Sequence, residues 1–357
     1  MKFYRFYSIL FFAGLILSCT NNDDPSVQGY IATPLELAVP AFFTSTILPP
    51  IIPENNPLTV EGVALGKKLF FDPILSSNNT LACANCHRPE NAFTDPRALS
   101  IGVTGEESFR NSMPLHNLAF NYREKFNWDG SATTLEQQMF VPVTNPVEMN
   151  NTWPNVENAL QSSAQYPILF EQAFGTNTID STLVTKAMSQ FVRTLISGNS
   201  KFDKFINGTE TLTPQEENGL AVFLDEGRGD CFHCHGLPES PLWTDNAFHN
   251  NGLDETFTDL GLGGFSGDPR EFGLFRSPTL RNLAFTAPYM HDGRFETLDE
   301  VIDHYSEGLV FSETIDPLMK AIAEGGVQLT ESDKADLKAF LLTLSDPSFT
   351  NDPNFRQ

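Results

Sequence analysis

The chain has 357 residues with 45 acidic and 22 basic side chains, which gives a formal net charge of −23 at pH 7. A charge of this size and sign excludes nucleic acid or an anionic surface as the expected partner. It is compatible with a basic partner protein, although a solvated acidic surface explains it equally well. The hydrophobic fraction of 40% allows ordinary cores, and a mature length of about 330 residues predicts two domains.

Residues 1–18 have the features of a secretion signal, with basic side chains near the start and a short apolar run at 6–17. That run is too short to span a bilayer. The string before Cys19 is similar to a bacterial lipobox, so Cys19 is predicted to be lipidated; an ordinary signal peptide is the alternative. Residues 19–57 are predicted to form a tether and N-terminal extension. We therefore expect an exported protein of the periplasm or cell envelope, attached to a membrane by its lipid anchor only.

Two C-x-x-C-H strings, at 83–87 and 231–235, match the attachment signature of a c-type haem. Two thiols three positions apart add to the two vinyl groups of one porphyrin, and the next histidine ligates the iron. A zinc ribbon is the alternative, but neither string has further Cys or His partners at zinc-finger spacing. The predicted cofactors are two covalent c-type haems. Their predicted binding residues are Cys83, Cys86, His87, Cys231, Cys234 and His235.

The hydrophobic pattern predicts a mainly α protein, because apolar residues recur at helical spacing and no strand alternation stands out. Helices are expected, in chain order, from Thr59 to about Phe70, at 135–139, 156–161 and 183–197, from Thr213 to about Leu224, at 298–305 and from Thr330 to about Leu344. Long irregular loops lie between them at 88–115 and 236–290. The two cysteine motifs are 148 residues apart (231 − 83), about one domain length. We expect two cytochrome c-like helical domains, at 58–205 and 206–357.

A series of further landmarks lies around the two motifs. In chain order they are LGKKLFFDP at 65–73, RNS at 110–112, WDG at 128–130, LEQQ at 135–138, NPVEM at 145–149, SPTLRN at 277–282 and TAPYMHDG at 286–293. On these residues, the stretch 58–345 resembles the bacterial dihaem cytochrome c peroxidases, the family that includes the MauG-type enzymes. The resemblance implies one haem in each of two cytochrome c-like domains, with a calcium ion between them.

The resemblance places the peroxidatic haem in the N-terminal domain, with His87 as its proximal ligand. It implies that Glu148 is the distal acid–base residue and that Gln137 is a second group of the distal pocket. Cleavage of peroxide needs a proton moved from the inner to the outer oxygen, and a carboxylate near the iron can move it. Trp128 matches the tryptophan between the two haems. A solvated loop carboxylate is the structural alternative for Glu148.

In the C-terminal domain the resemblance makes His235 the proximal ligand. The sixth ligand is a methionine in the peroxidases and a tyrosine in MauG-type proteins, and here the position falls on Tyr305. A tyrosinate favours ferric iron and lowers the potential. The rival ligands that remain open are His304, Met290 and Met319.

Two further features follow from the resemblance. Asn111, Thr286 and Pro288 match the calcium ligands, one side-chain oxygen and two backbone carbonyls, which suit a hard cation. The loop at 96–109 matches the segment that carries a capping histidine in many peroxidases, but it contains no His or Met. The nearest candidate is His116, which we interpret as a buried histidine. The first haem is therefore expected to be open.

The sequence thus predicts a dihaem cytochrome c peroxidase that reduces hydrogen peroxide to water. Its electrons are expected to come from a small donor protein, a cytochrome c or a copper protein, and to enter at the C-terminal haem. Assembly as a homodimer is compatible with the sequence. The first alternative is a MauG-type oxidase that uses a high-valent dihaem state on a protein or organic substrate. The second is a non-catalytic dihaem electron carrier, against which Glu148 and the open first haem argue.

Overall fold

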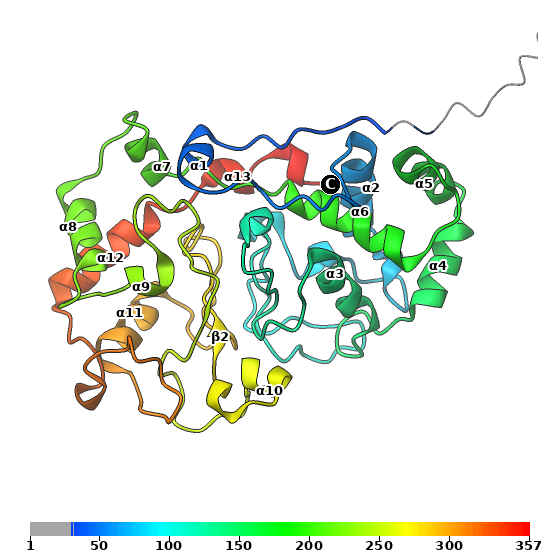
Figure 1. Ribbon diagram of the computed structural model, residues 1–357. Coiled ribbons are helices and arrows are strands. Elements are labelled where there is room, and N and C mark those ends of the chain that lie inside the picture. The colour runs from blue at the N-terminus through cyan, green and yellow to red at the C-terminus, as the bar shows by residue number, and fades with distance from the viewer. Residues whose placement is uncertain (1–29, 31) are drawn as a thin grey trace, which may run out of the picture. The chain divides into compact units, whose positions relative to one another are not determined.

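The computed structural model describes Tyr30 and residues 32–357 (Figure 1). Its α-helices are α1 (Ala41–Thr46), α2 (Val60–Phe71), α3 (Leu135–Thr144), α4 (Trp153–Gln161), α5 (Tyr166–Phe174), α6 (Ser181–Arg193), α7 (Lys201–Ile206), α8 (Pro214–Leu224), α9 (Phe232–His235), α10 (Leu262–Ser266), α11 (Leu298–Glu307), α12 (Glu331–Leu342) and α13 (Pro347–Thr350). Strands β1 (Phe248–His249) and β2 (Phe275–Arg276) pair antiparallel. The predicted mainly α fold is confirmed. The signal peptide and Cys19 lie outside the described residues, and no described helix is long and apolar enough to cross a membrane.

Six of these helices begin in the same way, with a threonine whose side chain accepts a hydrogen bond from a backbone N–H of the first turn. The N-cap residues are Thr59, Thr134, Thr152, Thr213, Thr297 and Thr330. Such a side chain satisfies one of the backbone donors that a helix start leaves unpaired. At Thr213 and Thr297 a glutamate three residues later bonds back to the cap, which explains the sharp helix starts predicted from the sequence.

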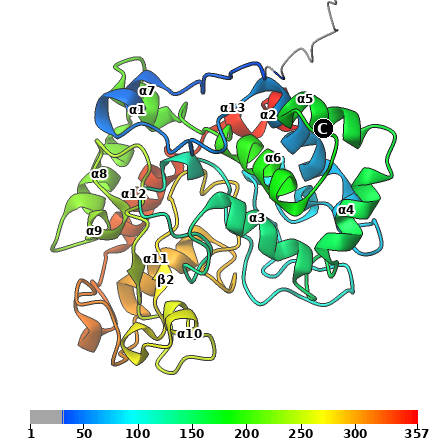
Figure 2. The same ribbon diagram turned by 45° about the vertical axis from the view of Figure 1, so that its right-hand side comes forward.

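Each half of the chain is built around a crossing of two helices, α2 with α6 and α8 with α12 (Figures 1 and 2). A glycine lies at each crossing. A Cβ on Gly66 would be 1.9 Å from the carbonyl oxygen of Ala187, and one on Gly219 would be 1.9 Å from that of Asp336. Only glycine lets the two backbones approach so closely. The two halves therefore repeat one packing scheme, as expected for two cytochrome c-like units.

The described residues form two main hydrophobic cores within one compact unit, 31–357. The first core takes its buried residues from Leu65 to Leu195 and the second from Phe202 to Leu344, and we call these regions the first and second lobes. The division is close to the predicted boundary at 205/206. The chain then returns, because Phe349 and Phe355 pack on the first core. The last residues thus belong with the first lobe in packing, which the predicted domain 206–357 did not anticipate.

The N-terminal extension at 32–57 is folded onto the lobes. Phe42 and Phe43 of α1 are buried together with Phe120 and Leu242, which come from the two lobes. The rings of Phe43 and Phe120 meet edge to face at 5.6 Å, a favourable geometry for aromatic pairs. This segment is therefore a structural contact between the lobes, whereas the sequence predicted only a tether and extension.

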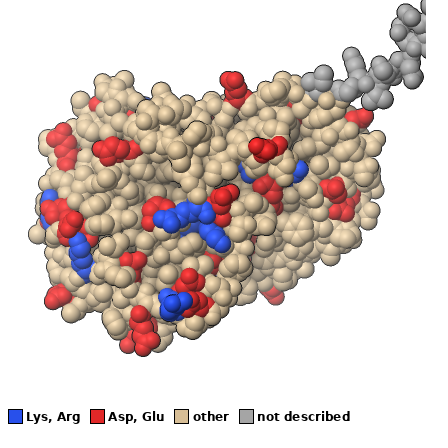
Figure 3. Space-filling view, in the orientation of Figure 1, with Lys and Arg blue, Asp and Glu red and all other residues tan. Residues whose placement is uncertain are grey.

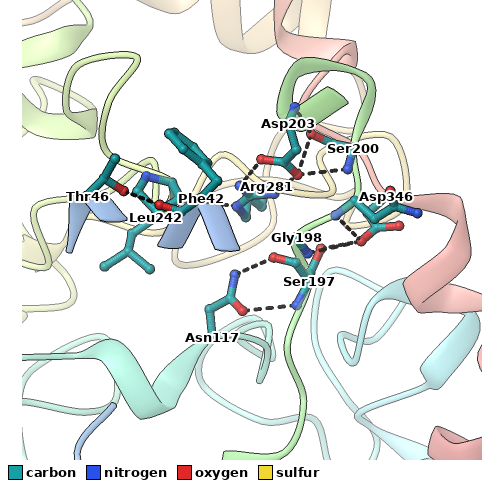
Figure 4. A network of polar contacts seen from close by, with 12 residues as sticks. Phe42, Thr46, Asn117, Ser197, Gly198, Ser200, Asp203, Leu242, Arg281 and Asp346 are labelled. Carbon is teal, nitrogen blue, oxygen red and sulfur yellow. Dashed lines mark hydrogen bonds and ion pairs between the residues drawn. The ribbon is translucent and has the colours of Figure 1, made fainter. Parts of the chain in front are cut away.

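The linker between α6 and α7 is held by a buried polar network (Figure 4). Ser197 exchanges two hydrogen bonds with Asn117, at 2.9 and 3.0 Å. The Asp346 carboxylate accepts hydrogen bonds from the backbone of Gly198 and Asn199, at 3.1 and 3.0 Å. Buried backbone donors need such partners, so Asp346 ties the start of the C-terminal segment to the linker.

Candidate haem sites

The first motif holds its histidine in the orientation that an iron ligand requires. His87 Nδ1 lies 2.9 Å from the carbonyl oxygen of Phe93, so Nδ1 carries the proton and Nε2 is left as the free ligand atom. Burial lowers the pKa of His87, which keeps the imidazole neutral as metal binding requires. The local geometry therefore fits a haem attached at Cys83 and Cys86.

A cavity of about 860 Å³ opens beside this histidine, between the motif, α3 and segments of the second lobe. It lies within the size range of cofactor pockets and is lined mainly by apolar groups with a few polar ones. Its wall includes Cys83, Cys86, His87, Gln138, Pro142 and Glu148. The residues present fit a porphyrin, because the two attachment thiols and the ligand face a space large enough to hold it.

Glu148 lies on the loop that follows α3 and lines this cavity. Burial raises the pKa of its carboxyl group, and a hydrogen bond from Asn145 Nδ2 to Oε1 at 2.6 Å partly offsets that rise. Its backbone oxygen accepts a hydrogen bond from Val103 N at 2.8 Å, which fixes the loop. A carboxyl group that is partly desolvated, with its pKa raised and its position held by one amide, is suited to proton transfer.

The structure corrects the prediction for Gln137. Its side chain is exposed and accepts hydrogen bonds from Thr133 N and Oγ1, at 2.9 and 2.7 Å, so it serves the start of α3. The neighbouring Gln138 lines the cavity, and its Oε1 is buried with no hydrogen-bond partner among the residues that the structure describes. Gln138 and Pro142 are four residues apart and share one helix face. That spacing could have indicated Gln138 as the inward-facing glutamine, but the prediction from the sequence named Gln137.

A pair of substitutions separates the two glutamines. We expect Gln138→Ala to lower peroxide turnover severalfold, because it removes a polar group that faces the cavity. Gln137→Ala is expected to leave turnover unchanged, since that side chain is in solvent. Steady-state peroxide consumption by the two haem-loaded variants measures the difference, and equal losses in both would contradict this placement.

Trp128 is buried at the contact between the lobes. Its Nε1 donates to the carbonyl oxygen of Asn111 at 2.8 Å, and its own carbonyl accepts from Arg276 N at 2.8 Å. Its ring lies 6.5 Å from that of His291 in an edge-to-face arrangement. Trp128 thus lines the first cavity while it contacts residues of the second lobe; its place between two haems stays a prediction.

Arg276 is a residue of the first cavity that sequence reasoning did not single out. It is 5% exposed, and within the described part of the chain its guanidinium contacts neutral groups alone. These are Asn246 Oδ1 at 2.6 Å, the carbonyl oxygen of Asn127 at 3.2 Å and Met113 Sδ at 3.4 Å. Burial lowers the pKa of Arg276 to about 10. A buried cation ordinarily has an anionic partner, and a haem propionate is an anion that this cavity would bring to it.

The second motif is also buried around its histidine. Burial lowers the pKa of His235 to about 4, and its Nδ1 has no hydrogen-bond partner among the described residues. Tyr305 on α11 lies within electrostatic reach of the two motif thiols, and burial raises the pKa of its hydroxyl to about 12. That hydroxyl accepts a hydrogen bond from Asn251 Nδ2 at 3.1 Å. The structure therefore brings Tyr305 to the second motif.

The rival sixth ligands are placed differently. The Sδ atom of Met290 lies 3.6 Å from the same Asn251 amide, so this methionine is close to Tyr305. His304 is buried, with its Nε2 3.1 Å from the carbonyl oxygen of Asn251. No described contact links Met319 to this cluster. Tyr305 stays the predicted ligand, with Met290 as its nearest competitor.

The proposed calcium ligands lie on segments that meet. Asn111 N donates to the carbonyl oxygen of His291 at 2.7 Å, which joins its segment to the one that contains Thr286 and Pro288. Asn111 Nδ2 donates to the carbonyls of Arg97 and Ala98, at 3.2 and 3.1 Å, so its Oδ1 points away from them. Among the described residues, no cluster of three or more acidic, His or Cys side chains suits a metal ion. The proposed site depends on neutral oxygens instead.

No strong ligand from the 96–109 loop caps the first haem position. The loop contributes Ser100, Gly102, Ser108 and Phe109 to the cavity wall. His116 does not line the cavity; it is buried, with Nδ1 3.4 Å from the carbonyl oxygen of Ala92. Its Nε2 has no partner among the described residues. The structure thus agrees that His116 is a buried histidine, although only one of its ring nitrogens is satisfied.

The comparisons with known proteins agree with this geometry. Residues 60–211 match the family model of the di-haem cytochrome c peroxidases. The chain is 36% identical to a methylamine utilization protein MauG of Methylophilus methylotrophus over 297 residues, which covers 82% of this chain and 84% of that protein. It is 30% identical to a cytochrome-c peroxidase of Pseudomonas sp. strain SCT over 373 residues, which covers 93% of this chain and 96% of that protein.

Among solved structures, the chain is similar to a MauG-like protein associated with microbial copper homeostasis. The TM-score is 0.81 at 34% sequence identity, and the match covers 90% of this chain and 98% of that one. Relatives of both kinds, MauG and peroxidase, therefore extend over most of the chain. With two haem-attachment motifs, each of which ends in a histidine, this chain belongs to the family of di-haem cytochrome c peroxidases and MauG proteins.

Proposed function

We propose that the chain reduces hydrogen peroxide to water at the first haem, with electrons that arrive through the second haem. The observation that carries the proposal is the pairing of Glu148 with His87 in one cavity. An electron carrier needs no buried carboxyl group beside an open iron position, whereas peroxide cleavage needs one. Membership of a haem oxidoreductase family supports the same reading.

Each residue of the first cavity has a distinct role in this proposal. The haem iron, when bound, supplies the open coordination position and the electrons for O–O cleavage. The Glu148 carboxylate takes the proton from the inner oxygen of peroxide and returns it to the outer oxygen, so that water leaves. Gln138 offers a hydrogen bond to the same substrate. Arg276 would hold a haem propionate, and His87 Nε2 would ligate the iron.

Electrons enter through the second lobe in this proposal, and Trp128 lies between the lobes to relay them. Residues 201–357 carry 28 acidic and 11 basic side chains, so most of the negative charge of the chain lies there. Figure 3 shows acidic side chains scattered over one face. A field of this sign attracts a basic donor. We therefore propose a small, positively charged cytochrome c or copper protein as the donor, with no nucleic acid partner.

Direct mixing experiments test the proposed function. We expect the oxidised, haem-loaded protein to have a high-spin first haem and to react with peroxide without prior reduction. It should then turn over peroxide with a reduced basic cytochrome, more slowly as salt concentration rises. Peroxide reaction without any donor turnover would favour the oxidase, and no peroxide reaction would favour the carrier.

The second candidate is a MauG-type oxidase that withdraws electrons from a protein or organic substrate. The observation that favours it is Tyr305, which lies at the second motif where peroxidases of the family have methionine. An anionic oxygen ligand favours the higher oxidation states of iron more than a thioether does. The two candidates share the first cavity and differ in what the second haem does.

Substitution of Tyr305 tests its assignment. We expect Tyr305→Phe to raise the potential of the second haem and to let small ligands bind there, because the oxygen ligand is lost. Absorption spectra during a redox titration measure both changes, and Tyr289→Phe, at another partly buried tyrosine of the second lobe, is the control. Unchanged spectra in Tyr305→Phe would indicate Met290 as the ligand.

We also propose a calcium ion between the lobes, held by Asn111, Thr286 and Pro288. Such a site would link a first-lobe segment to a second-lobe loop, beside Trp128. Chelation is expected to lower both the thermal midpoint and peroxide turnover, and added calcium should restore them. Asn111→Ala should abolish the response to calcium. A protein indifferent to chelation would contradict the site.

Export to the periplasm or cell envelope is part of the proposal, since c-type haems are attached outside the bacterial cytoplasm. The signal at 1–18 and the lipid on Cys19 stay predictions from the sequence. Membrane attachment through that lipid alone, and assembly as a homodimer, likewise remain proposals.

A further inference from the structure

We propose that the C-terminal tail, residues 346–355, positions the iron ligand of the first haem. It acts through the turn at 88–94, which we call the proximal turn. The inference depends on a haem attached at the first motif, and it is independent of whether that haem serves a peroxidase or an oxidase. Phe349, Phe355 and His116 are the positioning residues.

The proximal turn has an unusual backbone at the point where it meets His87. Ala92 and Phe93 have φ angles of +50° and +65°, so two successive residues with a Cβ are left-handed. This region is sparsely populated for residues with a side chain, so both residues hold a strained backbone conformation. The carbonyl that follows these angles, that of Phe93, is the one that His87 Nδ1 contacts at 2.9 Å. The ligand orientation thus depends on a strained conformation that needs outside support.

Phe93 is supported by Phe70 of the first lobe, whose ring lies 5.8 Å away, and by two rings from the far end of the chain. The Phe93 side chain is fully buried, and its ring lies 5.7 Å from Phe349 and 6.5 Å from Phe355. Helix α13 packs against the short helical turn Pro89–Asn91 of the proximal turn. Both views place α13 over the first lobe, beside α6 (Figures 1 and 2). The tail therefore covers the proximal turn.

A second set of contacts supports Ala92, the residue before Phe93. His116 Nδ1 lies 3.4 Å from the carbonyl oxygen of Ala92, and its ring meets Phe349 edge to face at 5.6 Å. The tail itself is anchored by Asp346, which bonds to the linker and accepts from Ser348 N and Phe349 N at 3.0 and 3.2 Å. The tail, His116 and the proximal turn therefore form one packed unit behind the ligand.

This unit controls how strongly the imidazole donates to iron. A carbonyl that accepts the Nδ1–H makes a histidine ligand more basic, and partners of this kind tune affinity and potential. Loosening the tail would let the proximal turn relax to ordinary φ angles and withdraw the Phe93 carbonyl. His87 would then donate less, and the first haem would be easier to reduce.

The test is Phe349→Ala in the haem-loaded full chain, with Phe170→Ala as the matched control. Phe170 is similarly buried in the first core but lies on α5, where its ring is 6.1 Å from that of Phe174. We expect Phe349→Ala to raise the midpoint potential of the first haem and to lower its ferrous iron–histidine stretching frequency. Phe349→Leu, which keeps bulk, should shift both less, and His116→Phe, which removes the donor to Ala92, should shift both in the same direction. The second haem is the internal reference.

The outcomes are separable. If Phe349→Ala and Phe170→Ala both lose thermal stability but only Phe349→Ala shifts the potential and the stretching frequency of the first haem, the tail is a positioning device. If both variants shift these two quantities, or if neither does, the inference is overturned and Phe349 is an ordinary residue of the hydrophobic core. Wild-type protein without a haem at the first motif would instead refute the proposed function. Should Phe349→Ala fail to fold, Phe349→Leu and Phe355→Ala carry the same comparison.

Discussion

Replacing Glu148 with alanine is expected to lower peroxide turnover by roughly a hundredfold or more, the usual scale for a general acid–base group. Both haems should stay attached, because the side chain of Glu148 hydrogen-bonds to Asn145 and, among the described residues, to neither motif. Glu148→Gln should lose about as much, since an amide cannot carry the proton between the two oxygens. The Soret absorbance per chain and the turnover rate measure the two properties separately.

The pH dependence gives a second readout for the same group. Burial raises the pKa of Glu148, and the proton shuttle must begin from the carboxylate. Turnover should therefore rise with pH through a value above that of an ordinary glutamate, and this limb should vanish in Glu148→Gln. Glu107→Ala, an exposed glutamate of the loop near the cavity, is the control and should keep both rate and profile. Full activity in Glu148→Ala would show that Glu148 is not the acid–base group of the first cavity.

Features with a local signature could be predicted from the sequence. The haem-attachment motifs depend on spacing within five residues. The helix starts at Thr59, Thr213 and Thr330 depend on a pattern of three or four neighbouring residues. The assignment of Glu148 to the first cavity came from the family resemblance, and the structure places it there.

The features that the sequence did not reveal are long-range or depend on helix phase. Gln137 and Gln138 differ by one step around α3, and which one faces inward is set by where the helix packs. Arg276 stands out because no described carboxylate contacts its guanidinium, and that depends on the three-dimensional fold. The return of Phe349 to the first core joins residues more than 250 positions apart, such as Phe93. No local pattern encodes such contacts.

Replacing Arg281 with methionine is expected to reduce the free energy of unfolding by about 3–5 kcal/mol, because it strands a buried carboxylate. Arg281 is 0% exposed and its side chain pairs with Asp203 through two contacts, at 2.8 and 2.6 Å (Figure 4). Burial would raise the pKa of Asp203, but Arg281 and Ser200 hold it below the usual value. The guanidinium also donates to the carbonyl of Pro241 and lies over the Phe43 ring at 5.2 Å.

These contacts join the start of the second lobe to the N-terminal extension. Their loss should therefore lower the free energy of unfolding of the whole folded protein. Urea unfolding of the haem-loaded protein measures it through the transition midpoint. Arg270→Met is the matched control, because Arg270 pairs with Asp268 at 2.5 Å on the surface with 89% of its side chain exposed; its midpoint should not change measurably. The double variant Asp203→Asn with Arg281→Met should recover part of the loss, since it leaves no charge unpaired. Equal midpoints for Arg281→Met and Arg270→Met would show that this buried pair adds little to the stability of the folded protein.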